Sequence, residues 1–549
     1  MSKKHFSQLW KERALTVAVL FVLSTITMFA QKVTGVVRDA SGEPLVGVNV
    51  VEKGATSNGA VTNINGEYQI NVATGKTLVF SYIGFESKEA TVKGNKLNVY
   101  LKEDSKLISD VVVVGYGSMQ RKDLTSSVTT VKADDLNKGV FTDPAQMLQG
   151  KVPGLIVTSN GDPNGTPSII LRGTSTFRDG AMSPYYVVDG IPGVDISMVA
   201  PDDIESIDIL RDATATAIYG SKAANGVILI TTKSGKNGKT NVSYNAYVGF
   251  DQISNKLDMM DADGLRSLSQ YGIAVDDNGG NTDWQKEVLR TGVSYNHNLS
   301  INGGSDKTKY SASVSYMDRK GIIKGTDFSR LNVRTLLTTK VLKDHLDLSV
   351  GANLVYGKHQ GVAMNWHGES VIDAMNYYSP LNPIYNEDGS YYRVSVQPDK
   401  NYNPLSMINE DTGENNMKRQ QFMAKATLHI IKGLDWNVNY AFNNYQRTNS
   451  TYNSHNSQVV SYKREGQSSR NTSFGHDNKF ETFGNYEVKF NDIHKLTAMF
   501  GYSWEETVYG DSFGMTLDTY YPNSDESRWN GMNAMNVTNG IHGISSGNK

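Results

Sequence analysis

VSYNHNLSIN, residues 293–302, alternates strictly between apolar or aromatic side chains and small polar ones. Because successive side chains of a β-strand point to opposite faces of its sheet, such a strand has one apolar and one polar face. The first set is Val293, Tyr295, His297, Leu299 and Ile301, and the second is Ser294, Asn296, Asn298, Ser300 and Asn302. This pattern predicts a strand that separates an apolar medium from a polar one.

Similar segments follow one another from about Thr240 onward. We count about nine of them, each close to the length that a tilted membrane strand needs. Further examples are LDLSVGANLVY (346–356), LDWNVNYAF (434–442) and LTAMFGYSW (496–504). The alternation therefore extends over the second half of the chain.

The connections between these segments switch between short and long. Short connections are expected at 303–308, 342–345, 432–433 and 491–494, an intermediate one at 318–327, and long ones at 251–292, 357–419 and 447–478. Outer-membrane barrels show this regularity because their periplasmic turns are short and their surface loops long. Residues 237–549 therefore predict part of an antiparallel transmembrane β-barrel. The alternative is a secreted solenoid or repeat sandwich with one solvated face.

The composition excludes several classes of protein. The 549 residues carry a net charge of −2, so the chain is not a polycation that would bind nucleic acid. Cysteine is absent, which excludes a disulfide scaffold, a thiol nucleophile and lipid attachment through cysteine. The mean hydropathy of −0.41 argues against a bundle of membrane helices.

Residues 1–30 have the features of a secretory signal peptide. A basic region that includes Lys3 and Arg13 precedes an apolar run over residues 14–30, which ends on Ala30. We predict export and cleavage after Ala30. The alternative is an uncleaved transmembrane anchor.

Residues 31–104 consist of short alternating runs separated by Gly, Asn and Pro, which predicts a small β-sandwich. Phe80, Tyr82 and Phe85 are expected in its core. The stretches GVVRDASGEPLVGVNV (35–50) and NINGEY (63–68) resemble the carboxypeptidase-regulatory-like domain, a Greek-key sandwich. This resemblance implies a fold and assigns no chemistry.

DVVVVGYGSMQ, residues 110–120, lies in a linker that we place at 105–120. A dinucleotide-binding loop requires G-x-G-x-x-G, and Gln120 occupies the position of the third glycine. We therefore reject a nucleotide site. A mobile segment of high β-propensity with a free edge instead suits pairing with an extended strand of a partner protein.

Residues 121–236 predict a compact mixed α/β unit. Asp143 and Pro144 can cap and open a helix over AQMLQ, and Asp212 can cap a second one over ATATAIY. GVILITTK, residues 226–233, is typical of a buried strand. The unit contains no histidine, so it has little means for general-base catalysis.

Motifs of catalysis are weak throughout the chain. GISSG (543–547) matches G-x-S-x-G but lacks the strand-to-helix turn that the nucleophile needs. The G-K-T at Gly75 lacks the upstream glycine of a P-loop, because Ile70 occupies that position, and H-E-x-x-H is absent. We therefore assign no catalytic residue, no metal ligand and no cofactor, and we expect that the protein is not an enzyme.

Three motifs together resemble the SusC/RagA family of TonB-linked outer-membrane transporters. They are VVVVGYGSMQ (111–120), the pair LRGTSTF (171–177) and YYVVDGIPG (185–193), and IESIDILRDATATAIYGSKAANGVILITTKSGK (204–236). The resemblance implies a mostly β protein in which the N-terminal sandwich is followed by a TonB box, by a plug domain (121–236) and by a 22-stranded barrel around the plug.

The chain departs from this family in the number of strands. About nine strands cannot enclose a plug, since barrel diameter grows with strand number. The run after Trp504 is expected to be another surface loop, and the chain ends at Lys549 rather than on an aromatic residue. We therefore interpret the chain as the N-terminal part of a transporter. A half barrel that closes by self-dimerisation is the alternative.

The valine segment is our predicted contact with TonB, which ExbB and ExbD energise in the inner membrane. The alternative is that these valines form the first strand of the plug. The predicted TonB-binding residues are Asp110, Val111, Val112, Val113, Val114 and Gly115.

The resemblance implies TonB-dependent import of a nutrient, most often a glycan oligosaccharide and otherwise a peptide, with a SusD-like lipoprotein as lid. It places the chain among the lipids of a Gram-negative outer membrane, with the N-terminal domain in the periplasm. The candidates for solute contact are Trp366, Tyr377, Tyr378, Tyr391 and Tyr392 in the longest loop and Arg172 in the plug motif. Alternatively, the aromatic rings pack the loop or the lid, and Arg172 holds the plug to the barrel wall. A non-transporting surface protein or adhesin is the other alternative function.

Overall fold

The computed structural model divides the chain into two compact units, one up to Val112 and one that contains the rest apart from residues 120–123. The predicted signal peptide lies outside the residues that the structure describes. Among the described residues, no helix combines the length and the apolar character needed to cross a lipid bilayer. The structure describes residues 31–39, 42–53, 55–82, 85, 87–102, 111–114, 117–120, 128–159, 162–163, 165–173, 182–211, 217–362, 370–394, 402–459, 466–490, 494–510, 512–518, 528 and 541–547.

The N-terminal unit is a β-sandwich, as predicted. One sheet has the order β4-β1-β7 and the other the order β3-β2-β5-β6. Phe80 is fully buried between them, and its ring packs edge-on against Tyr68 at 5.3 Å. The strands are β1 (Gln31–Arg38), β2 (Asn49–Glu52), β3 (Ala55–Val61), β4 (Glu67–Val72), β5 (Thr77–Ser81), β6 (Lys88–Thr91) and β7 (Val99–Tyr100).

The valine segment forms strand β8 (Val111–Val114), which pairs with β9 (Gly117–Gln120) in a two-stranded sheet. Neither strand belongs to the sheet of the plug among the described residues.

The plug is built on a five-stranded mixed sheet of order β10-β15-β16-β13-β14, beside a hairpin of β11 and β12. Its central strand is β16, which begins with four buried apolar residues and which the sequence predicted as buried. The described part of the plug also contains four short 3₁₀ helices: η2 (Pro144–Leu148), η3 (Ile196–Met198), η4 (Pro201–Asp203) and η5 (Ala217–Ala223). The strands are β10 (Val128–Lys132), β11 (Leu155–Thr158), β12 (Ser168–Leu171), β13 (Tyr185–Val188), β14 (Ile191–Pro192), β15 (Ile204–Leu210) and β16 (Val227–Thr232).

Helix η2 begins where the sequence predicted a helix. The carboxylate of Asp143 accepts the N–H of Ala145 at 2.8 Å, and Gln146 reaches back to the N–H of Asp143 at 3.4 Å. The predicted cap at Asp212 lies outside the described residues.

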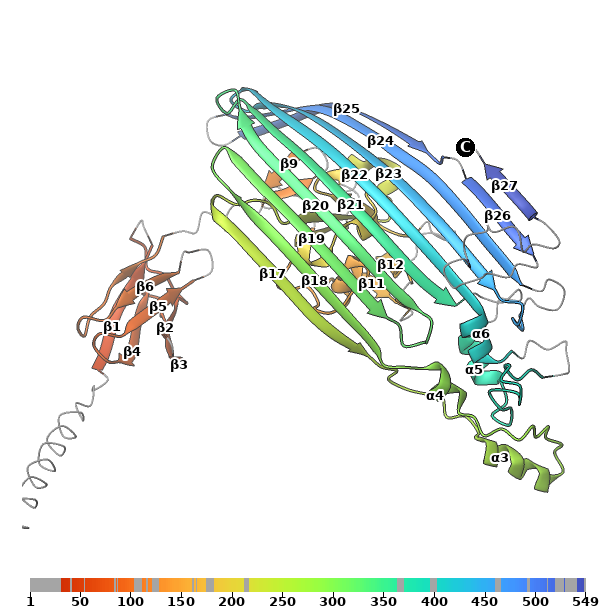
Figure 1. Cartoon of the computed structure of the whole chain (residues 1–549). Helices are drawn as coiled ribbons and strands as arrows, with labels where there is room; N and C mark the ends of the chain where they lie inside the picture. The colour runs from red at the N-terminus through yellow and green to blue at the C-terminus, as the bar shows by residue number, and fades with distance from the viewer. Residues whose placement is uncertain are drawn as a thin grey trace, which may run out of the picture. The chain divides into compact units, whose positions relative to one another are not determined.

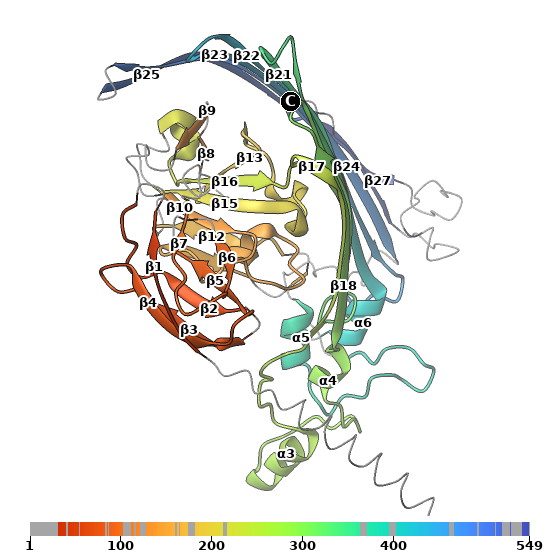
Figure 2. The ribbon, with the colours of Figure 1, turned by 90° about the vertical axis from the view of Figure 1, so that its left-hand side faces the viewer.

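The second half of the chain forms one antiparallel sheet of eleven strands, which curves around the plug (Figures 1 and 2). Strands follow chain order from β17 to β24, and β24 then pairs with β25 along one part of its length and with β26 along another. They are β17 (Gly238–Asp251), β18 (Gly292–Gly304), β19 (Thr308–Lys320), β20 (Asp327–Val341), β21 (Leu346–Val362), β22 (Asp411–Ile431), β23 (Leu434–Asn453), β24 (Gln467–Phe490), β25 (His494–Val508), β26 (Ser512–Asp518) and β27 (Ile541–Gly547).

Strand β18 has the two faces that its sequence predicted. The polar side chains of Ser294, Asn296 and Asn298 are buried toward the plug. Val293 and Leu299 on the other face are exposed. The sheet is thus apolar on its convex outer face and polar on its inner face.

Several strand ends differ from the prediction. The segment between β21 and β22 covers 363–410 instead of 357–419, and that between β23 and β24 covers 454–466 instead of 447–478. The run after Trp504 is not one loop, because it contains β26 and β27. The strands continue past the apolar band into polar sequence, since the ladder is held by backbone hydrogen bonds.

The long connections carry short helices that lie together at one end of the sheet (Figure 1). We call this the long-loop end. A small apolar core, which includes Trp284, Tyr378 and Met407, joins α4, α5 and α6. They are α3 (Ala262–Ser267), η6 (Leu268–Tyr271), α4 (Trp284–Val288), α5 (Val371–Tyr377) and α6 (Pro404–Glu410).

Candidate functional site

The polar inner face of the sheet holds the plug through direct hydrogen bonds. Asn298 donates to the carboxylate of Asp203 at 3.2 Å, and Ser313 donates to the same carboxylate at 2.6 Å. Asn296 donates to Asp202 at 2.7 Å. The polar half of the alternating pattern therefore binds the plug as well as facing the inside of the curved sheet.

Three further side chains of the wall bind backbone carbonyls of the plug. Arg330 of β20 donates to the carbonyl of Thr142 at 2.8 Å, next to the start of η2. Asn332 and Asn353 both donate to the carbonyl of Met198, at 3.1 and 2.8 Å. The two bonds to Met198 satisfy the carbonyl at the C-terminal end of η3, which would otherwise cost free energy when buried.

Asp189 of the plug is bound by two strands of the wall. Asp189 and Gly190 form the two-residue turn between β13 and β14, and both have positive φ, 48° and 76°. This is the backbone geometry that the sequence pair Asp-Gly favours in tight hairpins. The Asp189 carboxylate accepts the hydroxyl of Thr232 at 2.7 Å and Arg334 of β20 at 3.1 Å, and Lys425 of β22 donates to its carbonyl.

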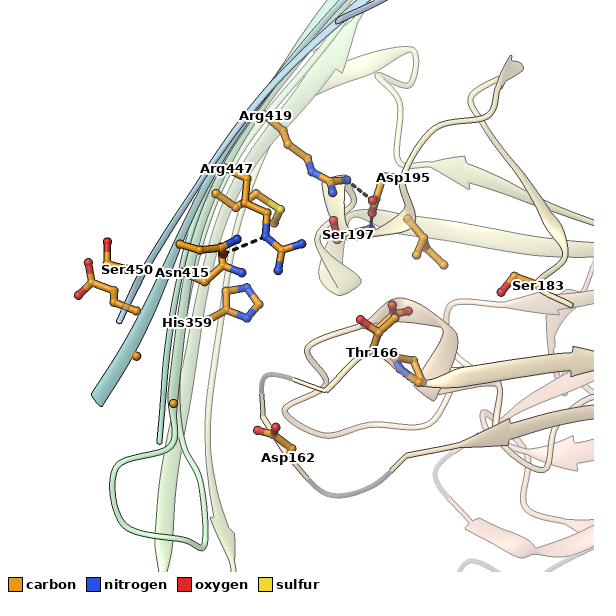
Figure 3. Close-up of a pocket in the computed structure, with 18 of the residues that line it drawn as sticks. Asp162, Thr166, Ser183, Asp195, Ser197, His359, Asn415, Arg419, Arg447 and Ser450 are labelled. Atoms are coloured by element: carbon orange, nitrogen blue, oxygen red, sulfur yellow. Dashed lines mark hydrogen bonds and ion pairs between the residues drawn. The ribbon is translucent and has the colours of Figure 1, made fainter. Parts of the chain in front are cut away.

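Between the plug and the wall lies a chamber of about 810 Å³ (Figure 3). The plug contributes the start of η2 and the turn before η3, and the wall contributes the ends of β21, β22 and β23 that lead into long connections. The chamber therefore lies toward the long-loop end. Its acidic, basic and histidine lining residues are Asp143, Asp162, Asp195, His359, Glu414, Arg419 and Arg447.

Arg419 connects the wall to the plug across this chamber. Its guanidinium forms an ion pair with Asp195, and Asp195 also accepts the N–H of Ser197 at 2.9 Å as the cap of η3 (Figure 3). Burial alone would raise the pKa of Asp195, but Arg419 and the Ser197 hydrogen bonds outweigh it and hold this pKa below its ordinary value. Asp195 is therefore ionised near neutral pH.

Asp143 has the opposite behaviour. Its burial raises the pKa of its carboxyl to about 6, although the N–H of Ala145 and the nearby Arg330 act against this rise. Tyr186, another lining residue, has a raised pKa because its hydroxyl is buried.

Those predicted solute contacts that the structure describes are not among the residues that line this chamber. Tyr378 is 2% exposed, packs edge-on against Trp284 at 5.0 Å, and donates its hydroxyl to the carbonyl of Tyr392 at 3.0 Å. The Tyr391 hydroxyl accepts a hydrogen bond from Asn409 at 2.7 Å. Tyr378 thus packs within the core of the long-loop helices, and contact of these tyrosines with solute stays a prediction.

Tyr377, in contrast, is 79% exposed on α5, and its contact with solute stays a prediction. Trp366 lies outside the described residues. Arg172 adopts a positive φ of 61° and donates to the carbonyl of Arg211 at 3.1 Å, which is a contact within the plug.

The sequence did not identify Arg419, Arg447, His359 or Asp195. The sequence did contain a signal for Arg419. Met417, Arg419 and Gln421 alternate along β22, and they lie on the face of this strand that points to the inside of the sheet. The prediction placed Arg419 and Arg447 at the ends of loops, so it did not assign either side chain to a face of the sheet.

Two family models match the chain. Residues 33–114 match the CarboxypepD_reg-like domain, and residues 120–227 match the TonB-dependent Receptor Plug Domain. The TonB-dependent receptor SusC of Bacteroides thetaiotaomicron is 38% identical over 412 residues, which are 71% of this chain and 40% of that protein. The chain belongs to the SusC/RagA family.

Other relatives agree with this membership. The TonB-dependent receptor P39 of Formosa agariphila is 34% identical over 499 residues, which are 87% of this SusC/RagA chain and 46% of that protein. The RagAB peptide importer in its open-open state superposes with a TM-score of 0.68 at 21% identity, over 80% of this chain and 53% of that chain. The chain spans about half the length of the curated relatives that it matches.

Proposed function

We propose that the protein takes part in TonB-dependent import of a nutrient across the outer membrane. One observation carries this proposal: a plug bound to the polar inner face of a curved sheet whose outer face is apolar. In a membrane, such a sheet can face lipid outside and hold a movable obstruction inside. The absence of a recognisable catalytic motif in the sequence fits a role in which no covalent bond changes.

The long-loop end would face the cell exterior, because surface loops are longer than periplasmic turns. The chamber would then be open to solute from outside, and the N-terminal sandwich would lie in the periplasm. A SusD-like lipoprotein is the proposed lid, by analogy with the SusC and RagAB relatives. The proposed solute is a glycan oligosaccharide, with a peptide as the second candidate because one structural relative is named a peptide importer.

TonB, energised by ExbB and ExbD, is the proposed source of force. The segment from Asp110 to Gly115 would offer the free edge of β8 to an extended strand of TonB. Pairing of this kind draws its affinity from backbone hydrogen bonds, so a simple valine run is sufficient. Tension on this segment would then rearrange the plug that follows it.

Deletion of Val111–Val114 tests the proposal in cells that depend on the solute for growth. We expect uptake to be lost while the protein still reaches the outer membrane and keeps its heat-modifiable migration. Replacing the four valines with threonine should preserve uptake, because threonine keeps the β-propensity and every backbone N–H. The double variant V112P/V113P should abolish it, because proline has no N–H to donate.

Full uptake by the deletion variant would contradict the proposal. A surface adhesin would show a different result, since its removal would leave growth on the solute unchanged.

A further inference from the structure

Two arginines of neighbouring strands point into the chamber together. In the pairing of β22 with β23, Arg419 lies opposite Tyr445 and Arg447 lies opposite Met417. The two arginines therefore occupy diagonal positions on the same face of the sheet, a spacing that long side chains can bridge. Figure 3 shows both guanidinium groups on the chamber side of the wall.

Among the described residues, these two guanidinium groups donate few hydrogen bonds to other groups of the protein. Arg447 donates to the side chain of Asn449 at 3.2 Å, and no carboxylate of the described residues forms an ion pair with it. The Nε of Arg419 is buried and has no hydrogen-bond partner among the described residues. An arginine has five N–H donors, so each group retains donors for a further acceptor.

The acidic residues of the chamber do not compensate for this pair. Glu414 is held by Lys358 at 2.8 Å. Asp143 and Asp162 belong to the plug side of the chamber, and neither forms an ion pair with Arg419 or Arg447 among the described residues. Only Asp195 forms an ion pair with one of the two arginines among the described residues. The wall between β22 and β23 therefore has an excess of positive charge.

We propose that Arg419 and Arg447 bind a carboxylate of the imported solute, so that the protein selects acidic oligosaccharides or acidic peptides over neutral ones. This inference rests on the proposed import function. Arginine suits this role because its planar fork binds a carboxylate through two parallel hydrogen bonds. Both solute classes carry the same group, and the experiment below separates them.

The solute must share Arg419 with Asp195. A solute carboxylate that takes over this guanidinium breaks the ion pair between β22 and the turn before η3. The plug then keeps its hydrogen bonds from Asn332 and Asn353 to Met198 but loses its charged contact at the chamber. Binding of solute thereby weakens one attachment of the plug to the wall.

Binding measurements on the purified full chain in detergent test the proposal. The probes are a galacturonic acid oligomer, its methyl ester, an acidic tetrapeptide and its amidated form. The ester and the amide keep the shape of each molecule and remove its charge. We expect at least one acidic probe to bind about tenfold or more tighter than its neutral form, as charge-assisted hydrogen bonds imply. The probe that shows this difference identifies the source of the carboxylate.

Variants assign the effect to the two arginines. R447Q and R419Q should each weaken binding of the acidic probe by about tenfold. D195N should strengthen it several-fold, because it removes the competing carboxylate while asparagine can still cap η3. K418Q is the matched control, since Lys418 lies beside Arg419 but contacts the ring of Tyr356 on the opposite face, and its binding should not change.

Three results would overturn the proposal. They are equal binding of the acidic and neutral probes, failure of both acidic probes to bind at millimolar concentration, and unchanged binding by R447Q and R419Q. Unchanged affinity in D195N would overturn the competition for Arg419. Each of these results leaves the valine deletion free to support import, so the two proposals can fail separately.

Discussion

The guanidinium of Arg334 lies 3.1 Å from a carboxylate oxygen of Asp189, and this ion pair joins β20 of the wall to the β13–β14 turn of the plug. Both side chains are largely buried, with exposed fractions of 6% and 17%. Lys425 approaches the same turn from β22, and Lys479 of β24 donates to the carbonyl of Pro192 at 2.6 Å. The β13–β14 hairpin is thus one of the places at which several strands of the wall hold the plug.

We expect D189N to loosen this turn. Asparagine tolerates the positive φ of position 189, so the backbone can stay the same, but Arg334 loses its buried counter-charge. Removing one partner of a buried ion pair costs about 3 kcal/mol or more. Hydrogen–deuterium exchange of the amides of residues 185–193 should be faster than in the wild type.

The matched control is E205Q, which breaks the exposed ion pair between Lys236 and Glu205. Exposed pairs contribute little, so its effect should be close to zero. If the amides of residues 185–193 exchange no faster in D189N than in E205Q, the ion pair between Arg334 and Asp189 does not hold the turn.

The buried carboxyl of Asp143 predicts a pH dependence of the plug. Its pKa of about 6 in the folded state exceeds the value of about 3.9 expected in an unfolded chain. The folded state therefore binds more protons between about pH 4 and pH 6, and stability near η2 falls as the pH rises through this window. D143N should remove the fall, because its amide stays neutral.

The check is hydrogen exchange of residues 144–148, compared between D143N and the wild type at the same pH. Protection should be similar at pH 4.5 and greater in the variant at pH 7. If the ratio of amide protection between D143N and the wild type is the same at pH 4.5 and pH 7, ionisation of Asp143 does not destabilise the plug. Greater protection of the wild type at pH 7 would show the same.

Tyr377 and Tyr378 are neighbours in sequence with opposite environments, 79% and 2% exposed. We expect Y378A to destabilise the apolar core of the long-loop helices by about 3–5 kcal/mol, because it leaves a cavity there. Y377A should leave this core intact. Limited proteolysis of the folded protein measures the difference, and equal cleavage of the two variants would contradict the packing role of Tyr378.

The sequence was sufficient for features that depend on neighbouring residues. The alternation in 293–302 set the two faces of β18, Asp143 and Pro144 placed the start of η2, and the short turn at 432–433 is present between β22 and β23. Each of these depends on strand periodicity, on capping chemistry or on turn length, all of which are local.

Features that depend on pairing between distant segments were not predictable. The first residues of β22, Asp411–Lys418, are mostly polar and form a strand because β21 and β23 lie on either side of them. The chamber combines plug residues such as Asp195 with wall residues such as Arg447, which become neighbours only when the sheet curves around the plug. Asp189 was part of a noted motif, but its partners Arg334 and Lys425 lie far along the chain.

We expect the outer face of the eleven-stranded sheet to contact lipid. Trp436 on β23 and Trp284 in the long-loop core, 38% and 3% exposed, allow a direct test. In variants that retain one of these tryptophans and carry phenylalanine in place of the others, fluorescence is measured in vesicles with brominated acyl chains. We expect strong quenching of Trp436 and little quenching of Trp284. A folded, monomeric protein that stays in water without detergent and shows no quenching of Trp436 would contradict the account.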